Sequence, residues 1–410
     1  MPNLRSLKLR GLLVSLEHVA GLGHLDLDHC LWSLPFRSIS HIVPMWLRLW
    51  ELHLKHSLNC FPGPGQQLTG ESAVQSRVLL MLRTLQVEDH NVENIAALIY
   101  SLELPFARTV DILYKVPCPA PADEAHYSLR SVFGGLAERN LLAVFKGLPT
   151  GMLFGIWFHL HPGTASVTVH NNEYAVRYED EAHSATLRIA TAFDRDWSRA
   201  LPSALQDLIE FFPRVRISTL VVRGDPYHVS IALWEDIFVK WCRDLETLRL
   251  TGNGSWLAAW RALSGRHTLP IEADDQQAHE RARALGRLRI KKVYIQHVSR
   301  PDDNFPAPPD ERVLEEIRAV LSHLSKSGRR LQELRWEVQR SRHLDFDDAR
   351  RRFMKALSPY VDRLSYEDSE SWNDPARLPV IGHGTKVPPS RLDATMLHEE
   401  LMELRRLLRA

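Results

Sequence analysis

LETLRLTGN, residues 245–253, spaces its leucines as LxxLxL, at Leu245, Leu248 and Leu250, and places Asn253 three residues after the last of them. Side chains alternate between the two faces of a strand, so Leu248 and Leu250 would share one apolar face. We expect Leu245 to start this strand and the Asn253 side chain to bond backbone groups where the chain turns away. One strand cannot bury such a face alone, so the pattern predicts stacked copies of itself.

Further copies of the pattern occur at uneven intervals. Cys30 and Asp225 stand at the position that Asn253 occupies in its own copy. The other copies begin at Leu4, Leu22, Leu49, Leu82, Ile217, Ile290 and Leu331, with a degraded last copy at Val361. These features are typical of leucine-rich repeats. The sequence therefore predicts an α/β protein with a leucine-rich-repeat-like solenoid, in which a curved sheet carries helices on its outer side and the repeats are irregular.

Amphipathic helices are predicted between the strands. The clearest lies in residues 310–328, where Asp310 would cap the N-terminus and Gly328 follows the last turn. Its apolar face would consist of Val313, Leu314, Ile317, Val320, Leu321 and Leu324. A second helix is predicted after Asn91, and its apolar residues at helical spacing are Val92, Ile95, Ala96, Ile99 and Leu102.

Residues 1–368 are predicted to form one solenoid, interrupted by a strand-rich insert at about 151–190. Apolar residues in the insert alternate with the period of a strand, first at Phe154, Ile156, Phe158 and Leu160 and later at Val167 and Val169. The segments HPGT and HNNE, residues 161–164 and 170–173, are predicted to be tight turns between these strands.

The C-terminal residues differ in composition from the repeats. Residues 369–391 are rich in proline and are predicted to be a tail over the last repeat or a linker. Residues 392–410 are predicted to form a terminal amphipathic helix. Its narrow seam of leucines is short for a coiled coil, which favours a capping helix over a dimerisation helix.

The composition is that of an ordinary globular protein. Of the 410 residues, 44% are hydrophobic and 25% charged, and 51 Lys and Arg oppose 50 Asp and Glu. The net charge of +1 gives no overall field that would favour nucleic acid or an anionic membrane. No apolar run suits a membrane span or a signal peptide, and the four cysteines are far apart without CxxC spacing. We expect no nucleic-acid or membrane partner and a cytoplasmic or nuclear location.

Motifs for catalysis or metal binding are weak. His159 and His161 would place two imidazoles on one face of a strand, but no further ligand stands at a supporting spacing. The remaining eighteen histidines are scattered, and the acidic cluster in HLDFDDARRRF, residues 343–353, is followed by arginines as in a solvated helix. GNGS, residues 252–255, lacks the lysine of a phosphate-binding loop. The sequence therefore predicts no catalytic, cofactor-binding or metal-binding residues, no cofactor and no enzymatic activity.

A partner-binding surface is predicted from the side chains between the leucines, which point away from the core. They are mixed in charge and include long polar and aromatic groups, as on the concave surfaces with which solenoids hold proteins. The candidate partner-binding residues are Asp26, Asp28, His53, Lys55, Gln86, Glu88, Arg223, Arg249, Thr251, Tyr294, Gln296, Arg335 and Glu337. A solvated face without a partner is the alternative.

The order of these units resembles fungal F-box proteins whose C-terminal part is an irregular leucine-rich repeat. The resemblance covers much of residues 80–368 and rests on LRTLQVED (82–89) followed by NVENIAALIYSLELP (91–105), on LETLRLTGN, and on GRRLQELRWEV (328–338) before YVDRLSYED (360–368). In that family an N-terminal helical F-box docks to a cullin-type ubiquitin ligase through an adaptor, while the repeats hold the substrate. No F-box helix beginning with LP is found in this sequence.

The resemblance implies the substrate-binding half of a ligase receptor, with the ligase adaptor as a partner only if an F-box lies upstream. Since Leu4 already belongs to a copy, we expect the chain to begin inside a repeat, as after truncation of the gene or loss of an N-terminal module. The predicted function is non-enzymatic protein recognition on the concave face. An interaction scaffold unrelated to ubiquitination is the main alternative, and an enzyme that uses the 151–190 insert is the less favoured one.

Overall fold

The computed structural model of the chain divides into two units, Met1–Asp368 and Ser369–Ala410. The residues that the structure describes lie in the first unit and are 5–14, 21–32, 48–58, 77–79, 81–92, 94–95, 98, 102–104, 107–116, 129, 152–153, 156–157, 162–170, 173–180, 184–190, 199–212, 216–254, 256–265, 285–286, 288–297, 309–338 and 345–368. The predicted tail at 369–391 and terminal helix at 392–410 lie outside them, as do Leu4, His159 and His161.

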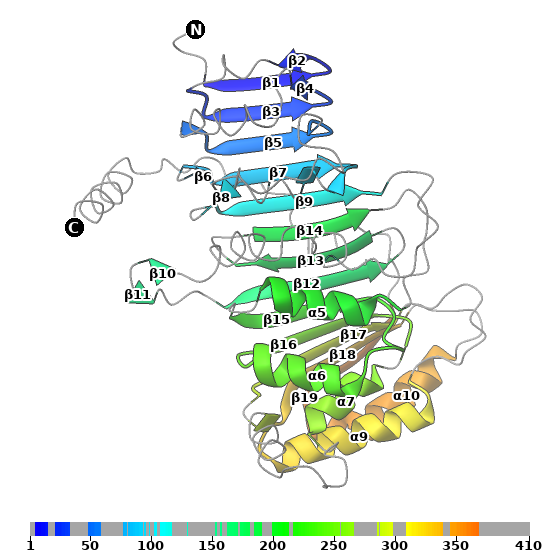
Figure 1. Ribbon diagram of the computed structural model, residues 1–410. Helices are drawn as coiled ribbons and strands as arrows, with labels where there is room; N and C mark the ends of the chain where they lie inside the picture. The colour runs from blue at the N-terminus through cyan, green and yellow to red at the C-terminus, as the bar shows by residue number, and fades with distance from the viewer. Residues whose placement is uncertain are drawn as a thin grey trace. The chain divides into compact units, whose positions relative to one another are not determined.

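A large open sheet of 13 strands extends through the first unit (Figure 1). The strands lie in the order β1 (Ser6–Arg10), β3 (His24–Asp28), β5 (Glu51–Lys55), β7 (Thr84–Asp89), β9 (Thr109–Lys115), β14 (Ser184–Ala190), β13 (Glu173–Glu179), β12 (Gly163–His170), β15 (Ile217–Arg223), β16 (Thr247–Gly252), β17 (Lys292–His297), β18 (Leu331–Val338) and β19 (Val361–Asp368). Neighbours are parallel except at β13, which is antiparallel to β12 and β14. The predicted α/β class is confirmed.

The leucine pattern gives the inner strands of the sheet one buried face, while Leu7 and Leu9 of the edge strand β1 are only partly buried. Leu248 and Leu250 of β16 are at most 1% exposed, and the corresponding pairs in β3, β5 and β7 are buried in the same core. The predicted start of the strand is wrong for β16, which begins at Thr247 although Leu245 is fully buried, whereas Ile217, Leu331 and Val361 do start their strands. The first residue of the pattern likewise precedes its strand at Leu22, Leu49, Leu82 and Ile290. In these copies the first residue of the pattern packs against the core from the residues just before the strand. This contact fixes where the strand enters the sheet.

The turn after β16 requires its glycines. A Cβ atom on Gly252 would lie 1.8 Å from the carbonyl oxygen of Gly224, which follows β15, and Gly254 has a φ of +159°. Backbone cannot swing aside as a side chain can, so only glycine fits at position 252. The GNGS segment therefore serves the close packing of neighbouring strand ends.

The insert contributes three strands to the main sheet, but in reversed order. The chain passes from β9 to β12, which pairs with β15, and returns through β13 to β14, which pairs with β9. The two ends of HNNE lie as a tight turn requires, since His170 of β12 pairs with Glu173 of β13, and Asn171 and Asn172 lie outside the described residues. The prediction of HPGT as a turn is wrong at Gly163 and Thr164, which already belong to β12. Of the residues in the alternation predicted from Phe154, Ile156 lies in the short pair β10 (Met152–Leu153) and β11 (Ile156–Trp157), whereas Phe154, Phe158 and Leu160 lie outside the described residues.

Helices cover one face of the C-terminal half of the sheet (Figure 1). They are α5 (Leu201–Phe211), α6 (Ile231–Asp236), α7 (Leu257–Ser264), α9 (Glu311–Lys326) and α10 (Phe346–Leu357), with a π-helical turn at Ile237–Trp241 and a 3₁₀ turn at Ser358–Tyr360. Short strand pairs are formed by β2 (Leu13–Val14) with β4 (Leu31–Trp32) and by β6 (Arg77–Val78) with β8 (Leu102–Glu103). In the described part of the chain, no helix is long and apolar enough to cross a membrane.

The best-predicted helix is α9. All six predicted apolar residues are buried, and the Asp310 carboxylate accepts a hydrogen bond of 2.8 Å from the Val313 backbone N–H. Asp345 caps α10 in the same way, and Asp348 forms ion pairs with Arg351 and Arg352, so the acidic cluster belongs to a solvated helix.

The helix after Asn91 is capped as predicted. The Asn91 side-chain oxygen accepts a hydrogen bond of 3.1 Å from the Asn94 backbone N–H. Its predicted extent is wrong at Leu102, which lies in β8. Ala96 and Ile99 lie outside the described residues.

Candidate functional site

The outward side chains of the sheet align in two rows that cross all 13 strands. The first row is Lys8, Asp26, His53, Gln86, Asp111, Thr186, Arg177, Ser166, Val221, Arg249, Tyr294, Arg335 and Ser365. The second row is Arg10, Asp28, Lys55, Glu88, Leu113, Arg188, Ala175, Thr168, Arg223, Thr251, Gln296, Glu337 and Glu367.

All 13 predicted partner-binding residues lie in these rows, but the structure separates them into two groups. Asp26, Asp28, His53, Lys55, Gln86 and Glu88 lie on β3, β5 and β7, whereas the other seven lie on β15 to β18. Between the groups stand β9, β14, β13 and β12, whose outward residues the sequence reasoning missed. One prediction is wrong, because Thr251 is only 7% exposed and offers little surface to a partner.

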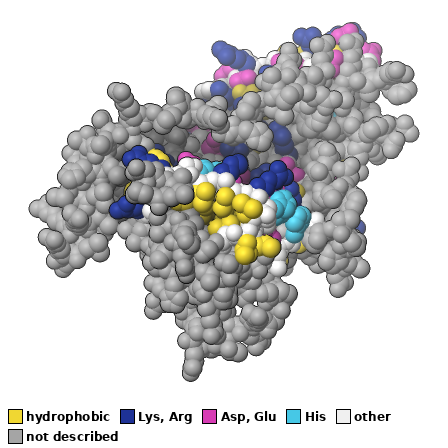
Figure 2. Space-filling view, turned by 90° about the horizontal axis from the view of Figure 1, so that it is seen from above, with side chains coloured by type: hydrophobic (Ala, Val, Ile, Leu, Met, Phe, Trp, Pro, Cys, Tyr) yellow, Lys and Arg dark blue, Asp and Glu magenta, His cyan; other side chains and the backbone are white. Residues whose placement is uncertain are grey.

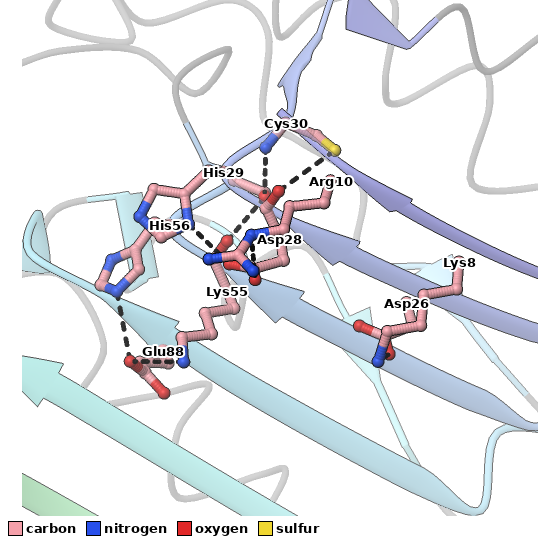
Figure 3. Close-up of polar contacts among 10 residues, drawn as sticks. Lys8, Arg10, Asp26, Asp28, His29, Cys30, Lys55, His56 and Glu88 are labelled. Atoms are coloured by element: carbon pink, nitrogen blue, oxygen red, sulfur yellow. Dashed lines mark hydrogen bonds and ion pairs between the residues drawn. The ribbon is translucent and has the colours of Figure 1, made fainter. Parts of the chain in front are cut away.

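Charged groups on the N-terminal group of strands are paired across the sheet (Figure 3). The Lys8 ammonium lies 2.5 Å from the Asp26 carboxylate, and the Arg10 guanidinium lies 3.3 Å from that of Asp28. The hydrogen bond of Asp28 with His29 is the main cause that holds the pKa of this carboxyl below its usual value. Each of these cations faces a carboxylate on the neighbouring strand, so little charge is left uncompensated.

Glu88 forms ion pairs with cationic side chains of both neighbouring strands. Its carboxylate lies 2.5 Å from the Lys115 ammonium and 3.7 Å from that of Lys55, and His56 Nε2 lies 3.2 Å away. Partial burial would raise the pKa of Glu88, but Lys115, Lys55 and His56 together lower it below its usual value. Glu88 therefore stays ionised and joins three strands electrostatically.

Three histidines stack at the ends of β3, β5 and β7. The ring centroids of His29 and His56 are 4.6 Å apart, and those of His56 and His90 are 4.4 Å apart. His29 and His56 both have positive φ, at 52° and 47°, and their backbone N–H groups donate to Lys55 and Glu88 of the next strands. His29, His56 and His90, called the histidine stack below, thus lie side by side at the ends of three neighbouring strands.

Two further histidines meet on the outward face of β3 and β5. The rings of His24 and His53 are 5.3 Å apart, and His24 Nδ1 lies 2.5 Å from the Glu51 carboxylate. In the described ranges, His24, Asp26 and His53 form the one group of metal-ligating side chains that lie together, with ligand atoms within 4.8 Å of one another. The interpretation of the histidines as scattered is therefore wrong for these five. The signal was available as the recurring DxDH, HxKH and VEDH strand endings, which bring histidines together once the strands are parallel and in register.

Arginines dominate the C-terminal group. The Arg249 guanidinium carbon lies 5.0 Å from the ring centroid of Tyr294, and the Tyr294 hydroxyl donates to Glu333. Burial lowers the pKa of the Arg223 guanidinium, while Glu173 opposes that shift. Among the residues that the structure describes, neither Nε of Arg223 nor Nε of Arg249 has a hydrogen-bond partner. Nε of Arg335 has no hydrogen-bond partner among them either, but this guanidinium forms ion pairs at 2.7 Å with Glu337 and 2.6 Å with Glu367.

Apolar side chains are exposed near the β1 edge of the sheet. Leu12 is 52% exposed, Leu13 69% and Leu31 49%. Seen from this side, hydrophobic side chains lie beside lysine, arginine and histidine (Figure 2). β1 pairs with β3 along one edge, and in the described ranges no strand pairs with its other edge.

The two described cysteines, Cys30 and Cys242, are buried free thiols. Burial raises the pKa of the Cys242 thiol well above its usual value, which makes it a poor nucleophile. Neither residue adds a reactive group to the outward face.

No protein-family model matches this chain, and a search of curated proteins finds no match.

Proposed function

We propose that residues 1–368 form a leucine-rich-repeat-like solenoid that recognises a protein partner through the outward face of its sheet. The recurring LxxLxL strands, their shared core and the parallel register of four consecutive strand pairings on each side of the insert support this fold. The outward rows would supply a long surface of mostly polar side chains, which Leu113, Ala175 and Val221 interrupt. This role requires no catalysis, and the buried free thiols suit a cytoplasmic or nuclear protein.

The observation that carries the proposal is that the Arg223 and Arg249 guanidiniums have no carboxylate partner among the described residues. The other charged side chains of the two rows form ion pairs with neighbouring residues. These two guanidiniums form no ion pair with another described residue. An incompletely hydrogen-bonded, half-buried guanidinium gains from an incoming carboxylate or phosphate, which it can bind through two parallel N–H groups. The surface therefore suits a partner segment that carries acidic groups.

The test is affinity capture with the wild-type chain and with the double variant Arg223→Glu, Arg249→Glu. A bound partner should lose at least about tenfold in affinity, since breaking a buried charge pair at an interface costs about 2–5 kcal/mol. The matched control is Arg312→Glu, Arg318→Glu on the exposed side of α9, which should bind as the wild type does. Equal affinity of all three proteins would contradict the proposal, provided that circular dichroism shows each to be folded.

The same capture separates the two versions of the function. Recovery of a cullin-ligase adaptor with the wild-type chain, or with a longer product of its gene, supports a receptor related to F-box proteins. Recovery of other partners without the adaptor supports the alternative, a scaffold unrelated to ubiquitination.

A further inference from the structure

We infer that His24, Asp26 and His53 form a binding site for a divalent transition-metal ion, with Zn²⁺ as the expected occupant. Two imidazoles and one carboxylate are a ligand set that zinc accepts, with water completing a tetrahedral site. The inference is independent of the proposed recognition function.

The fold places the three ligands together by register alone. Asp26 and His53 are direct partners on β3 and β5, and His24 stands two residues before Asp26 on the same face. The intervening Leu25 and Leu52 are fully buried, which fixes the strands and holds the ligands on the opposite side. The ligand atoms already lie within 4.8 Å of one another. Zinc ligands at about 2.0–2.1 Å stand about 3.3 Å apart, so small side-chain rotations would close the site.

Each of the two histidines has a ring nitrogen available to bind a metal ion. His24 Nδ1 lies 2.5 Å from the Glu51 carboxylate, an arrangement that fixes the ring and leaves Nε2 as the free ligand nitrogen. His53 Nε2 is buried, and the described residues offer it no hydrogen bond, so a bound ion would satisfy it.

Lys8 is the group that opposes the ion. Its ammonium lies 2.5 Å from Asp26 Oδ2 and would repel a cation bound to the same carboxylate. The Lys8 side chain is 75% exposed, so it can swing into solvent when the ion arrives. Removing the Lys8 charge should therefore strengthen metal binding. No such effect is expected if the histidines serve only the packing of the strands.

The experiment titrates the purified full chain with ZnCl₂ in competition with a chromophoric chelator. His53→Ala and His24→Ala should each abolish the binding of one Zn²⁺ ion per chain. Glu51→Gln should lower the affinity for this ion by about 10–100-fold, as loss of an orienting partner does. Lys8→Gln should raise this affinity several-fold.

His29→Asn is the matched control, because it removes a nearby histidine outside the site at a positive φ that Asn tolerates. It should bind zinc as the wild type does. The inference is overturned if the wild type and His53→Ala bind the same number of equivalents with the same affinity, or if Lys8→Gln weakens the site. Circular dichroism on each variant separates a lost ligand from a lost fold.

Discussion

Asp207 is a buried carboxylate that holds two elements of the core together through hydrogen bonds. It lies on α5, is only 2% exposed, and accepts hydrogen bonds of 2.5 Å from the Tyr174 hydroxyl and 2.7 Å from the Leu129 backbone N–H. Burial and the nearby carboxylate raise the pKa of the Tyr174 hydroxyl well above its usual value, so this hydroxyl remains a donor. The residue therefore ties α5 to the middle strand of the insert.

Asp207→Ala should destabilise the protein by about 2–6 kcal/mol, because two buried donors lose their acceptor and each costs about 1–3 kcal/mol. Urea unfolding measures the effect. Asp207→Asn keeps one acceptor oxygen and should lose less, while Gln206→Ala on the exposed side of α5 should change little. An unchanged unfolding free energy for Asp207→Ala would show that the two hydrogen bonds contribute nothing.

Single residues of the outward face were largely predictable. Strand alternation places Arg249 and Tyr294 outward from the leucine spacing alone. What no local pattern contains is the pairing of these residues with distant ones, such as Asp111 with Arg188, whose guanidinium lies 2.8 Å away across β9 and β14. The burial of Thr251 was missed for the same reason, since it depends on neighbours far along the chain.

At the level of elements, the histidine stack of His29, His56 and His90 makes the N-terminal strand ends sensitive to acid. Partial burial and the neighbouring His90 hold the pKa of His56 below its ordinary value. As the pH falls, the unfolded chain takes up this proton first. The contribution to stability is therefore present above about pH 6.5 and is lost as the pH falls through the lower folded-state pKa.

Stability should therefore fall more between about pH 7.5 and about pH 5.5 in the wild type than in His56→Asn. Asn tolerates the φ of 47° at this position but does not titrate. Urea unfolding at the two pH values provides the comparison. A drop of the same size in both proteins would mean that other groups cause the acid sensitivity.

Elements with complete local signals were predicted well. α9 has a capping aspartate, a six-residue apolar face and a following glycine, and each of these features has its expected place. The strand at Leu102 was taken for helix because its leucine continues the spacing of Ile95. Its pairing with β6 lies outside any local window, which is why periodicity failed there.

For the whole molecule, the insert joins two blocks of parallel strands into one sheet. In a simple solenoid each repeat contacts only its neighbours in sequence, so damage stays local. Here β14 reaches back to β9 and β12 reaches forward to β15, so both blocks depend on the insert. The alternating residues of 151–190 predicted strands, but their reversed order could not be predicted, because either outer strand of the insert could have paired with β9.

This dependence can be tested with two chemically equal cavities. Leu187→Ala in β14 and Leu25→Ala in β3 each remove a fully buried side chain and should each cost about 2–5 kcal/mol. Hydrogen exchange should show lost protection near β3 alone for Leu25→Ala, but on both sides of the insert for Leu187→Ala. The same exchange pattern in the two variants would contradict the bridging role of the insert.

The antiparallel course of β13 also limits how this protein can change in evolution. A meander reverses direction at each turn, so only an odd number of strands brings both of its outer strands into the common direction of the flanking blocks. The insert has three, and β14 and β12 are both parallel to their outer neighbours. Related sequences that keep the two blocks parallel should therefore gain or lose length here by whole hairpins, whereas addition or loss of a single strand would turn one block against the other.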